Sequence, residues 1–153
     1  MSKIHLATKE SALSDPSYRY QIDKLDIKAQ GKQGNMTTYF LNSEGIADKI
    51  SRSSKLFGKY ISNGLSCPSG FDKEKSCLTF KGTYSYDQIF KYFMEFVQVY
   101  VLCPICDYPE MRLYNQKDKA KKLGIYYHCE SCGSDNLVNA KLDKTYEFIE
   151  KNI

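Results

Sequence analysis

Four cysteines in two pairs are the residues best suited to chemistry in this sequence. The motif CPIC occupies residues 103–106 and the motif CESC occupies residues 129–132. Each CxxC turn points two sulfurs toward one place, and four thiolates around one point form the tetrahedral site that Zn²⁺ prefers. The sequence therefore predicts one zinc ion held by Cys103, Cys106, Cys129 and Cys132.

The predicted zinc site is structural rather than catalytic. Four protein ligands fill the coordination sphere and leave no position for a reactive water. A domain of short strands has little core, and a structural zinc ion contributes on the order of 10 kcal/mol to folding. A redox dithiol, or a set of unrelated thiols, is the alternative interpretation of this spacing. His128 could replace one thiolate but fits a strand position, and Cys67 and Cys77 fit partly buried thiols.

A lysine-rich stretch lies between the two cysteine pairs, where a zinc ribbon has the tip of a hairpin. Its basic residues are Lys117, Lys119, Lys121 and Lys122. Clustered ammonium groups can contact the phosphates of RNA. A solvated loop explains the same composition equally well, so both interpretations stay open.

An arginine between two tyrosines, at Tyr18, Arg19 and Tyr20, stands out because the chain has 19 lysines and three arginines among its 22 basic residues. A guanidinium has a permanent charge and a planar fork of donors that matches phosphate oxygens. Residues 1–20 lack hydrophobic periodicity, so we expect a flexible arm that can carry Arg19 to a partner. A surface arginine whose stem packs on a tyrosine ring is the alternative.

Residues 21–100 are expected to form an α-β domain. Alternating apolar residues predict strands at 25–29 and 36–41 around a glycine-rich turn, and a second hairpin over 67–82. Three helices are expected, the first two capped by serine or asparagine and the third opened by a capping box. The cap of the first helix is Asn42 or Ser43. The second helix is capped by Ser53 or Ser54 and ends at Asn63 and Gly64. The capping box of the third helix is Ser85 with Gln88. The third helix should bury Ile89, Phe93 and Val97.

Residues 101–153 are expected to form the zinc ribbon, with a closing strand around 146–149. The fold class predicted for the whole chain is α+β: a small mixed sheet with packed helices, followed by a four-cysteine zinc ribbon of antiparallel strands.

The composition favours a cytoplasmic protein with a weakly basic surface. The net charge is +4 and the pI is about 8.6, which is compatible with RNA or acidic partners. No apolar run is long enough to span a membrane, and the N-terminal residues lack the apolar core of a signal peptide. In a reducing compartment, six cysteines favour metal binding over disulfides.

These features together resemble the family of eukaryotic translation initiation factor 5 and the beta subunit of initiation factor 2. The helix that runs into YVLCPICDYPE, followed by a ribbon that contains HCESCGS, resembles the core that both share. The arm SDPSYRYQIDKL and the segment KTYEFIEKN resemble factor 5 in particular. The resemblance covers residues 14–152.

The resemblance implies the GTPase-activating portion of factor 5. Such a portion is not itself a GTPase. It acts on the GTP-bound gamma subunit of initiation factor 2, on the small ribosomal subunit near rRNA and initiator tRNA. Arg19 would be the arginine finger, oriented by Tyr18 and Tyr20, and Lys59 matches a lysine that supports activation. Thr37 stands where the family has another functional lysine, which argues against full activity. We expect a monomer.

Two other functions fit the same resemblance. One is a ribosome-binding module at the initiator tRNA site without GTPase activation, and the other is a subunit like the beta subunit of initiation factor 2. Family members carry a C-terminal helical-repeat domain that the 153 residues do not include. We therefore expect a stand-alone activator domain or a natural short form with weaker recruitment. A divergent protist, or a large DNA virus acting in its host's cytoplasm, is the hypothesis for its source.

Overall fold

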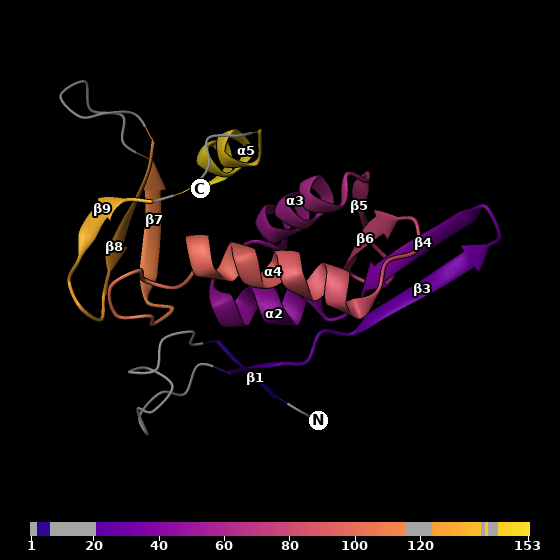
Figure 1. Cartoon of the computed structure of the whole chain (residues 1–153), viewed down its shortest axis with the longest axis horizontal. Coiled ribbons are helices and arrows are strands. Elements are labelled where there is room, and N and C mark those ends of the chain that lie inside the picture. Colours follow the sequence, from indigo (N-terminus) through magenta and orange to yellow (C-terminus); the bar gives the residue numbers. More distant parts are fainter. Residues whose placement is uncertain (1–2, 7–20, 116–123, 139, 141–143) are drawn as a thin grey trace. The chain divides into compact units, whose positions relative to one another are not determined.

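A computed structural model of the chain describes residues 3–6, 21–115, 124–138, 140 and 144–153 (Figure 1). The chain divides into two compact units, built mainly from residues 22–95 and 96–153. Strand β1 (Lys3–His5) pairs with strand β2 (Gln21–Asp23). The sequence does not predict β1, which lies inside the expected arm, and the rest of that arm, residues 7–20, lies outside the described residues.

The first unit is built on a four-stranded sheet in the order β3-β4-β6-β5. Its strands are β3 (Ile27–Lys32), β4 (Asn35–Phe40), β5 (Ser69–Asp72) and β6 (Cys77–Lys81). All three neighbouring pairs are antiparallel. The α+β class is confirmed, but the expectation of a mixed sheet is wrong. Tight hairpin turns join β3 to β4 and β5 to β6, and such turns can connect only antiparallel strands.

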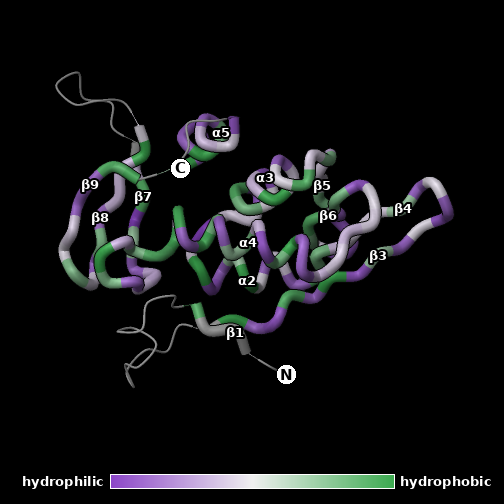
Figure 2. The backbone as a smooth tube through the Cα atoms, in the orientation of Figure 1, coloured by the Kyte–Doolittle hydropathy of each residue, from purple (hydrophilic) through white to green (hydrophobic). Residues whose placement is uncertain are grey.

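This sheet has one packed face and one open face. Thr38, Phe40 and Phe80 are buried, whereas the residues that alternate with them include the exposed side chains of Lys28 and Lys81. Figure 2 shows hydrophilic residues along the outer part of the β3–β4 hairpin. The period-two alternation of a half-buried strand produces this division.

Three helices accompany the sheet: α2 (Ser43–Ile50), α3 (Ser54–Leu65) and α4 (Tyr86–Tyr100). Helix α3 lies next to α2, and its Phe57 ring packs against Phe93 of α4. The rings of Phe40, Phe57 and Phe93 form a cluster with centroids 5.5–6.1 Å apart. Edge and tilted ring contacts of this kind stabilise the core beyond the burial of area. The predicted stripe of the third helix is confirmed, because Ile89, Phe93 and Val97 are buried in α4. In α2, the buried residues Ile46, Ala47 and Ile50 form a similar stripe.

Two of the predicted helix caps are confirmed. Ser53 caps α3, because its side chain accepts a hydrogen bond from the N–H of Lys55 at 3.3 Å. The capping box before α4 is formed in both directions. The N–H of Ser85 donates to Gln88 Oε1 at 2.9 Å, and the N–H of Gln88 donates to Ser85 Oγ at 3.3 Å.

The cap of α2 differs from the prediction in its chemistry. Asn42 occupies the cap position but makes no side-chain hydrogen bond to the helix. Its amide instead accepts from the N–H of Asp26 at 2.9 Å and donates to the carbonyl of Lys24 at 3.0 Å. Ser43 Oγ accepts from the N–H of Leu78 at 3.0 Å. Both polar side chains therefore connect the helix to other parts of the unit instead of closing its first turn.

The sequence predicts that α3 ends at Asn63 and Gly64, but the helix does not end there. The helix continues to Leu65, and Ser66 follows in the left-handed conformation with a φ of 57°. A Cβ placed on Gly64 would overlap the ring of Tyr92 in α4. The glycine therefore allows a close approach between two helices.

The second unit contains a three-stranded antiparallel sheet in the order β7-β8-β9, followed by a helix. The elements are β7 (Met111–Asn115), β8 (Ile125–Cys129), β9 (Asp135–Leu137) and α5 (Lys144–Asn152). The predicted closing strand at 146–149 is wrong, because this segment is part of α5. Tyr146 and Ile149 are buried together with Thr145. A spacing of three residues puts the first two on one helix face, whereas a strand would group Tyr146 with Phe148.

Replacing Tyr146 with phenylalanine is expected to destabilise the second unit by about 1–3 kcal/mol. The Tyr146 hydroxyl accepts a buried hydrogen bond from the N–H of Ile125 at 2.8 Å, so the change leaves that donor unsatisfied. Denaturant unfolding of the metal-loaded protein measures the change. Tyr114→Phe is the matched control, because it removes a tyrosine hydroxyl that donates to Asp135 at an exposed site. Equal losses in the two variants would contradict this account.

Within the described residues, no helix combines the length and the apolar character needed to cross a bilayer.

Candidate metal centre

The four cysteines selected by spacing come together in the second unit. Their sulfur atoms all lie within 4.8 Å of one another. The sulfurs of Cys103 and Cys132 are 3.7 Å apart, and those of Cys106 and Cys129 are 3.6 Å apart. A tetrahedron of sulfurs about 2.3 Å from a central Zn²⁺ has edges of about 3.8 Å. Both the type of donor and the spacing therefore fit a tetrahedral thiolate site.

The two turns that present these sulfurs share one backbone pattern. The N–H groups of Asp107 and Gly133 each donate to the carbonyl of the first cysteine of their pair, at 2.9 Å in both turns. The N–H of that first cysteine donates to the carbonyl of the residue five positions later, at 3.0 Å to Tyr108 and 2.9 Å to Ser134. Each turn is therefore closed by its own hydrogen bonds, independently of the other turn.

Asp107 is a site residue that the sequence analysis missed. Its φ is 64°, close to the 77° of Gly133 at the equivalent position. Aspartate is one of the few residues with a side chain that adopts this left-handed conformation, and this side chain is buried. The sequence pattern that could have identified Asp107 is its place directly after the first cysteine pair, which matches the place of Gly133 after the second cysteine pair.

The sulfurs differ in their surroundings. Cys103 and Cys129 are buried, Cys106 is half-buried and Cys132 is exposed. Burial raises the pKa of the Cys106 thiol to about 12 and also raises the pKa of Cys129. A hydrogen bond with the Ser134 side chain lowers the pKa of Cys132 to about 6. Without a metal, the thiols of Cys106 and Cys129 thus keep their protons at neutral pH.

Metal affinity is expected to weaken steeply as the pH falls. At pH 7 the thiols of Cys106 and Cys129 must each release a proton when they become ligands. As the pH falls through about 6, the Cys132 thiolate of the metal-free protein gains a proton, which must also be displaced. Calorimetric titration with Zn²⁺, repeated in buffers of different ionisation enthalpy, gives the number of protons released per metal ion. Release of fewer than two protons per metal at pH 7 would contradict the assignment.

The remaining candidate metal ligands lie outside this cluster. His128 is in β8, as its strand pattern predicts, and its Nδ1 lies 3.5 Å from Asp135 Oδ2. Cys67 is half-buried and Cys77 is buried, both in the first unit. Burial raises the pKa of the Cys77 thiol. These positions agree with the interpretation of both as packed thiols.

Most of the residues proposed for partner contacts lie outside the described residues. This group contains Tyr18, Arg19, Tyr20, Lys117, Lys119, Lys121 and Lys122. Lys59 is half-buried in α3, and the hydroxyl of the adjacent Tyr60 donates to Glu95 Oε2 at 3.4 Å. Thr37 lies in β4, between Gln30 on one side and Lys81 on the other.

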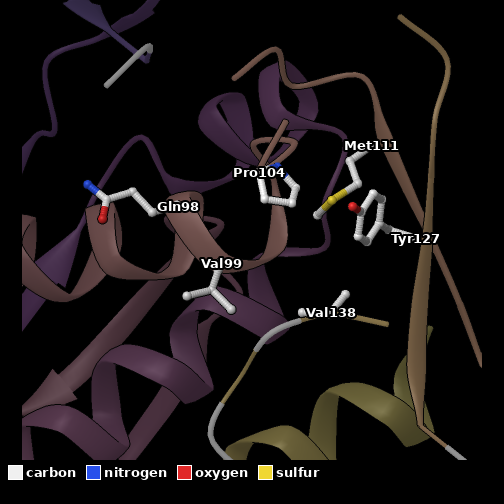
Figure 3. A pocket seen from close by; sticks show the side chains of 6 residues that line it. All are labelled: Gln98, Val99, Pro104, Met111, Tyr127 and Val138. Carbon is white, nitrogen blue, oxygen red and sulfur yellow. The ribbon is translucent and has the colours of Figure 1, made fainter. Parts of the chain in front are cut away.

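A pocket of about 160 Å³ lies in the second unit, next to the first cysteine pair (Figure 3). None of the six described residues that line it carries a carboxylate, an imidazole or an amine. They are Gln98, Val99, Pro104, Met111, Tyr127 and Val138. The lining is mainly apolar, and its polar side chains are those of Gln98 and Tyr127.

Comparison with known proteins gives a consistent family assignment. A family described as the domain found in initiation factors 2B and 5 matches residues 10–135. The chain is 29% identical over 141 residues to eukaryotic translation initiation factor 5 of Caenorhabditis elegans, covering 92% of this chain and 31% of that protein. The factor 5 of Drosophila melanogaster is also 29% identical, with 92% and 30% covered.

An archaeal relative matches a larger share of its own length. Translation initiation factor 2 subunit beta of Nanoarchaeum equitans is 32% identical over 106 residues, which cover 69% of this chain and 71% of that protein. The chain thus spans under a third of the two factor 5 relatives but most of the archaeal beta subunit.

Proposed function

The chain belongs to the domain family found in initiation factors 2B and 5, and from this premise we propose that it is a factor 5-like translation initiation protein. In this proposal it stimulates GTP hydrolysis by initiation factor 2 on the small ribosomal subunit, when the start codon is selected. The observation that carries the proposal is the match over residues 10–135, which includes Arg19 and all four cysteines. The factor 5 relatives cover 92% of the chain, which favours their activity over that of the archaeal beta subunit.

The proposed mechanism is an arginine supplied in trans to another protein's GTPase site. In GTP hydrolysis, negative charge spreads over the oxygens of the transferring phosphoryl group. The guanidinium of Arg19 would neutralise that charge in the gamma subunit of initiation factor 2, with Tyr18 and Tyr20 orienting it and Lys59 supporting it. The protein itself would bind no nucleotide, and it would act in the cytoplasm as a monomer.

The metal centre would fix the ribbon and take no part in the reaction. Its four sulfurs match the donor type and the spacing that Zn²⁺ prefers. Because four cysteines fill a tetrahedral site, the ion supplies folding energy and leaves no open position for substrate. Cys103, Cys106, Cys129 and Cys132 would hold it.

The test is single-turnover GTP hydrolysis by a preassembled complex of small subunit, mRNA, initiator tRNA and GTP-bound initiation factor 2. Adding the chain should raise the rate well above that of the same complex without it. A control reaction uses the chain with GTP alone, where no hydrolysis is expected. Normal binding to the complex without any increase in rate would overturn the proposal.

The open face of the sheet favours a second candidate function, an RNA-contacting module without GTPase activation. Lys28, Lys32 and Lys81 are exposed on it, and the Lys75 ammonium lies 3.1 Å from Gln30 Oε1 of the same face. Such a face can contact phosphates of rRNA or initiator tRNA, and the lysines at 117–122 remain a separate proposal for such contacts. Salt-dependent binding to the small subunit, with an unchanged hydrolysis rate, would select this function.

The archaeal relative supports a third candidate, a subunit like the beta subunit of initiation factor 2. It predicts a stable complex between this chain and the gamma subunit in the absence of the ribosome. Size-exclusion chromatography of the two purified proteins tests it, and separate elution would exclude it.

A further inference from the structure

One side chain contacts sulfurs of both cysteine turns. Ser134 Oγ lies 3.2 Å from Cys132 Sγ and 3.3 Å from Cys103 Sγ. These two sulfurs belong to different turns and are 3.7 Å apart. The hydroxyl therefore lies against one edge of the sulfur tetrahedron, where it contacts a ligand from each half of the site.

The backbone of Ser134 is held by contacts on both sides. The carbonyl of Ser134 accepts from the N–H of Cys129 at 2.9 Å. The next residue, Asp135, begins β9 and pairs with His128 of β8. These contacts fix the backbone of Ser134 beside the two cysteine turns, and from that position its hydroxyl reaches both sulfurs.

The chemistry of the contact depends on the state of the sulfurs. A metal-bound thiolate has lone pairs and no proton, so it can only accept a hydrogen bond. The hydroxyl has one proton to donate, and hydrogen bonds to an ionised acceptor are the stronger kind. Four thiolates around a divalent ion leave a net charge of about −2, which such a donor stabilises.

Among the four ligands, Cys132 is the exposed one. Water, competing chelators and oxidants reach its sulfur first, so loss of the metal is expected to begin there. We propose that Ser134 is a positioning residue of the metal centre: its single hydroxyl proton is shared between the thiolates of Cys132 and Cys103, as in a three-centre hydrogen bond, and this contact slows metal release through the exposed sulfur. This inference rests on the proposed zinc binding.

The test uses the full chain loaded with Zn²⁺ or Co²⁺ and compares Ser134→Ala with two other variants. Ser134→Thr keeps a hydroxyl at the same position. Ser131→Ala removes the same atom from an exposed residue inside the same turn. Transfer of Zn²⁺ to a colorimetric chelator gives the release rate, and the sulfur-to-metal charge-transfer band of the Co²⁺ form reports the electron density on the thiolates.

Loss of the Ser134 hydroxyl should weaken metal affinity by about 10- to 100-fold, with faster release, as for other residues that support metal ligands. The Co²⁺ band should move to lower energy because the thiolates become more electron-rich. Ser134→Thr should restore both readouts, and Ser131→Ala should leave both unchanged.

Three results would overturn the inference. They are an unchanged release rate in Ser134→Ala, a faster rate without a shift of the Co²⁺ band, and a failure of threonine to restore either readout. The proposed metal centre has a separate test, because a wild-type chain that gives no tetrahedral tetrathiolate spectrum with Co²⁺ would overturn the site itself.

Discussion

Alanine at position 19 is expected to remove the stimulation of GTP hydrolysis, with a rate loss of about 10³- to 10⁵-fold in the assembled initiation complex. The loss corresponds to about 4–7 kcal/mol of barrier. A guanidinium presents two N–H groups in one plane to the phosphoryl oxygens, and no other side chain reproduces this geometry. Lysine at position 19 should therefore restore only a small part of the rate, although it keeps the charge.

Arg112→Ala is the matched control for this experiment. Arg112 is an exposed arginine in β7, and it pairs with Glu130 at 2.9 Å. An exposed ion pair of this kind contributes little to stability, so the variant should fold and should stimulate hydrolysis normally. The measurement is quench-flow of a single turnover at saturating protein, which separates the chemical step from recruitment. Equal rates for wild type and Arg19→Ala would remove the arginine finger from the mechanism.

Replacing Cys129 with serine is expected to unfold the ribbon at neutral pH. Cys129 is fully buried at the end of β8, and its backbone joins the second turn to β9 through Ser134. Serine is a poor zinc ligand, and loss of a structural zinc ion removes on the order of 10 kcal/mol of folding free energy. A chelator acting on the wild type should have the same effect.

Amide hydrogen exchange on β7, β8 and β9 measures this loss, because unfolded strands exchange without protection. Cys67→Ser is the matched control, since it makes the same atomic change at a half-buried cysteine outside the cluster. It should leave the exchange of those strands and the metal content unchanged. Retained protection in Cys129→Ser would show that the ribbon folds without the metal.

Features that depend on the spacing of nearby residues could be predicted from the sequence. Two CxxC motifs identify four ligands because each turn is short and closes on itself. The capping box at Ser85 and Gln88, and the apolar stripe that follows it, are also set within one or two helical turns. The α+β class followed from these local patterns.

Features that depend on distant contacts could not be predicted in this way. Asn42 has the right type for a helix cap, but Asp26 and Lys24 engage its amide from another part of the chain. Glycine often ends a helix, but Gly64 lies inside α3, where the nearby ring of Tyr92 leaves no room for a side chain. The segment of α5 has only nine residues, too few for its period to be distinguished from that of a strand.

The matching backbone patterns of the two cysteine turns have a consequence for how this protein can change during evolution. Each turn is closed by its own hydrogen bonds, so neither depends on the number of residues between the ends of β7 and β8. Insertions or deletions between the paired strands β7 and β8, which leave their register intact, can therefore accumulate without altering the coordination sphere. The ribbon can in this way acquire a new contact surface while its metal-binding geometry is inherited unchanged.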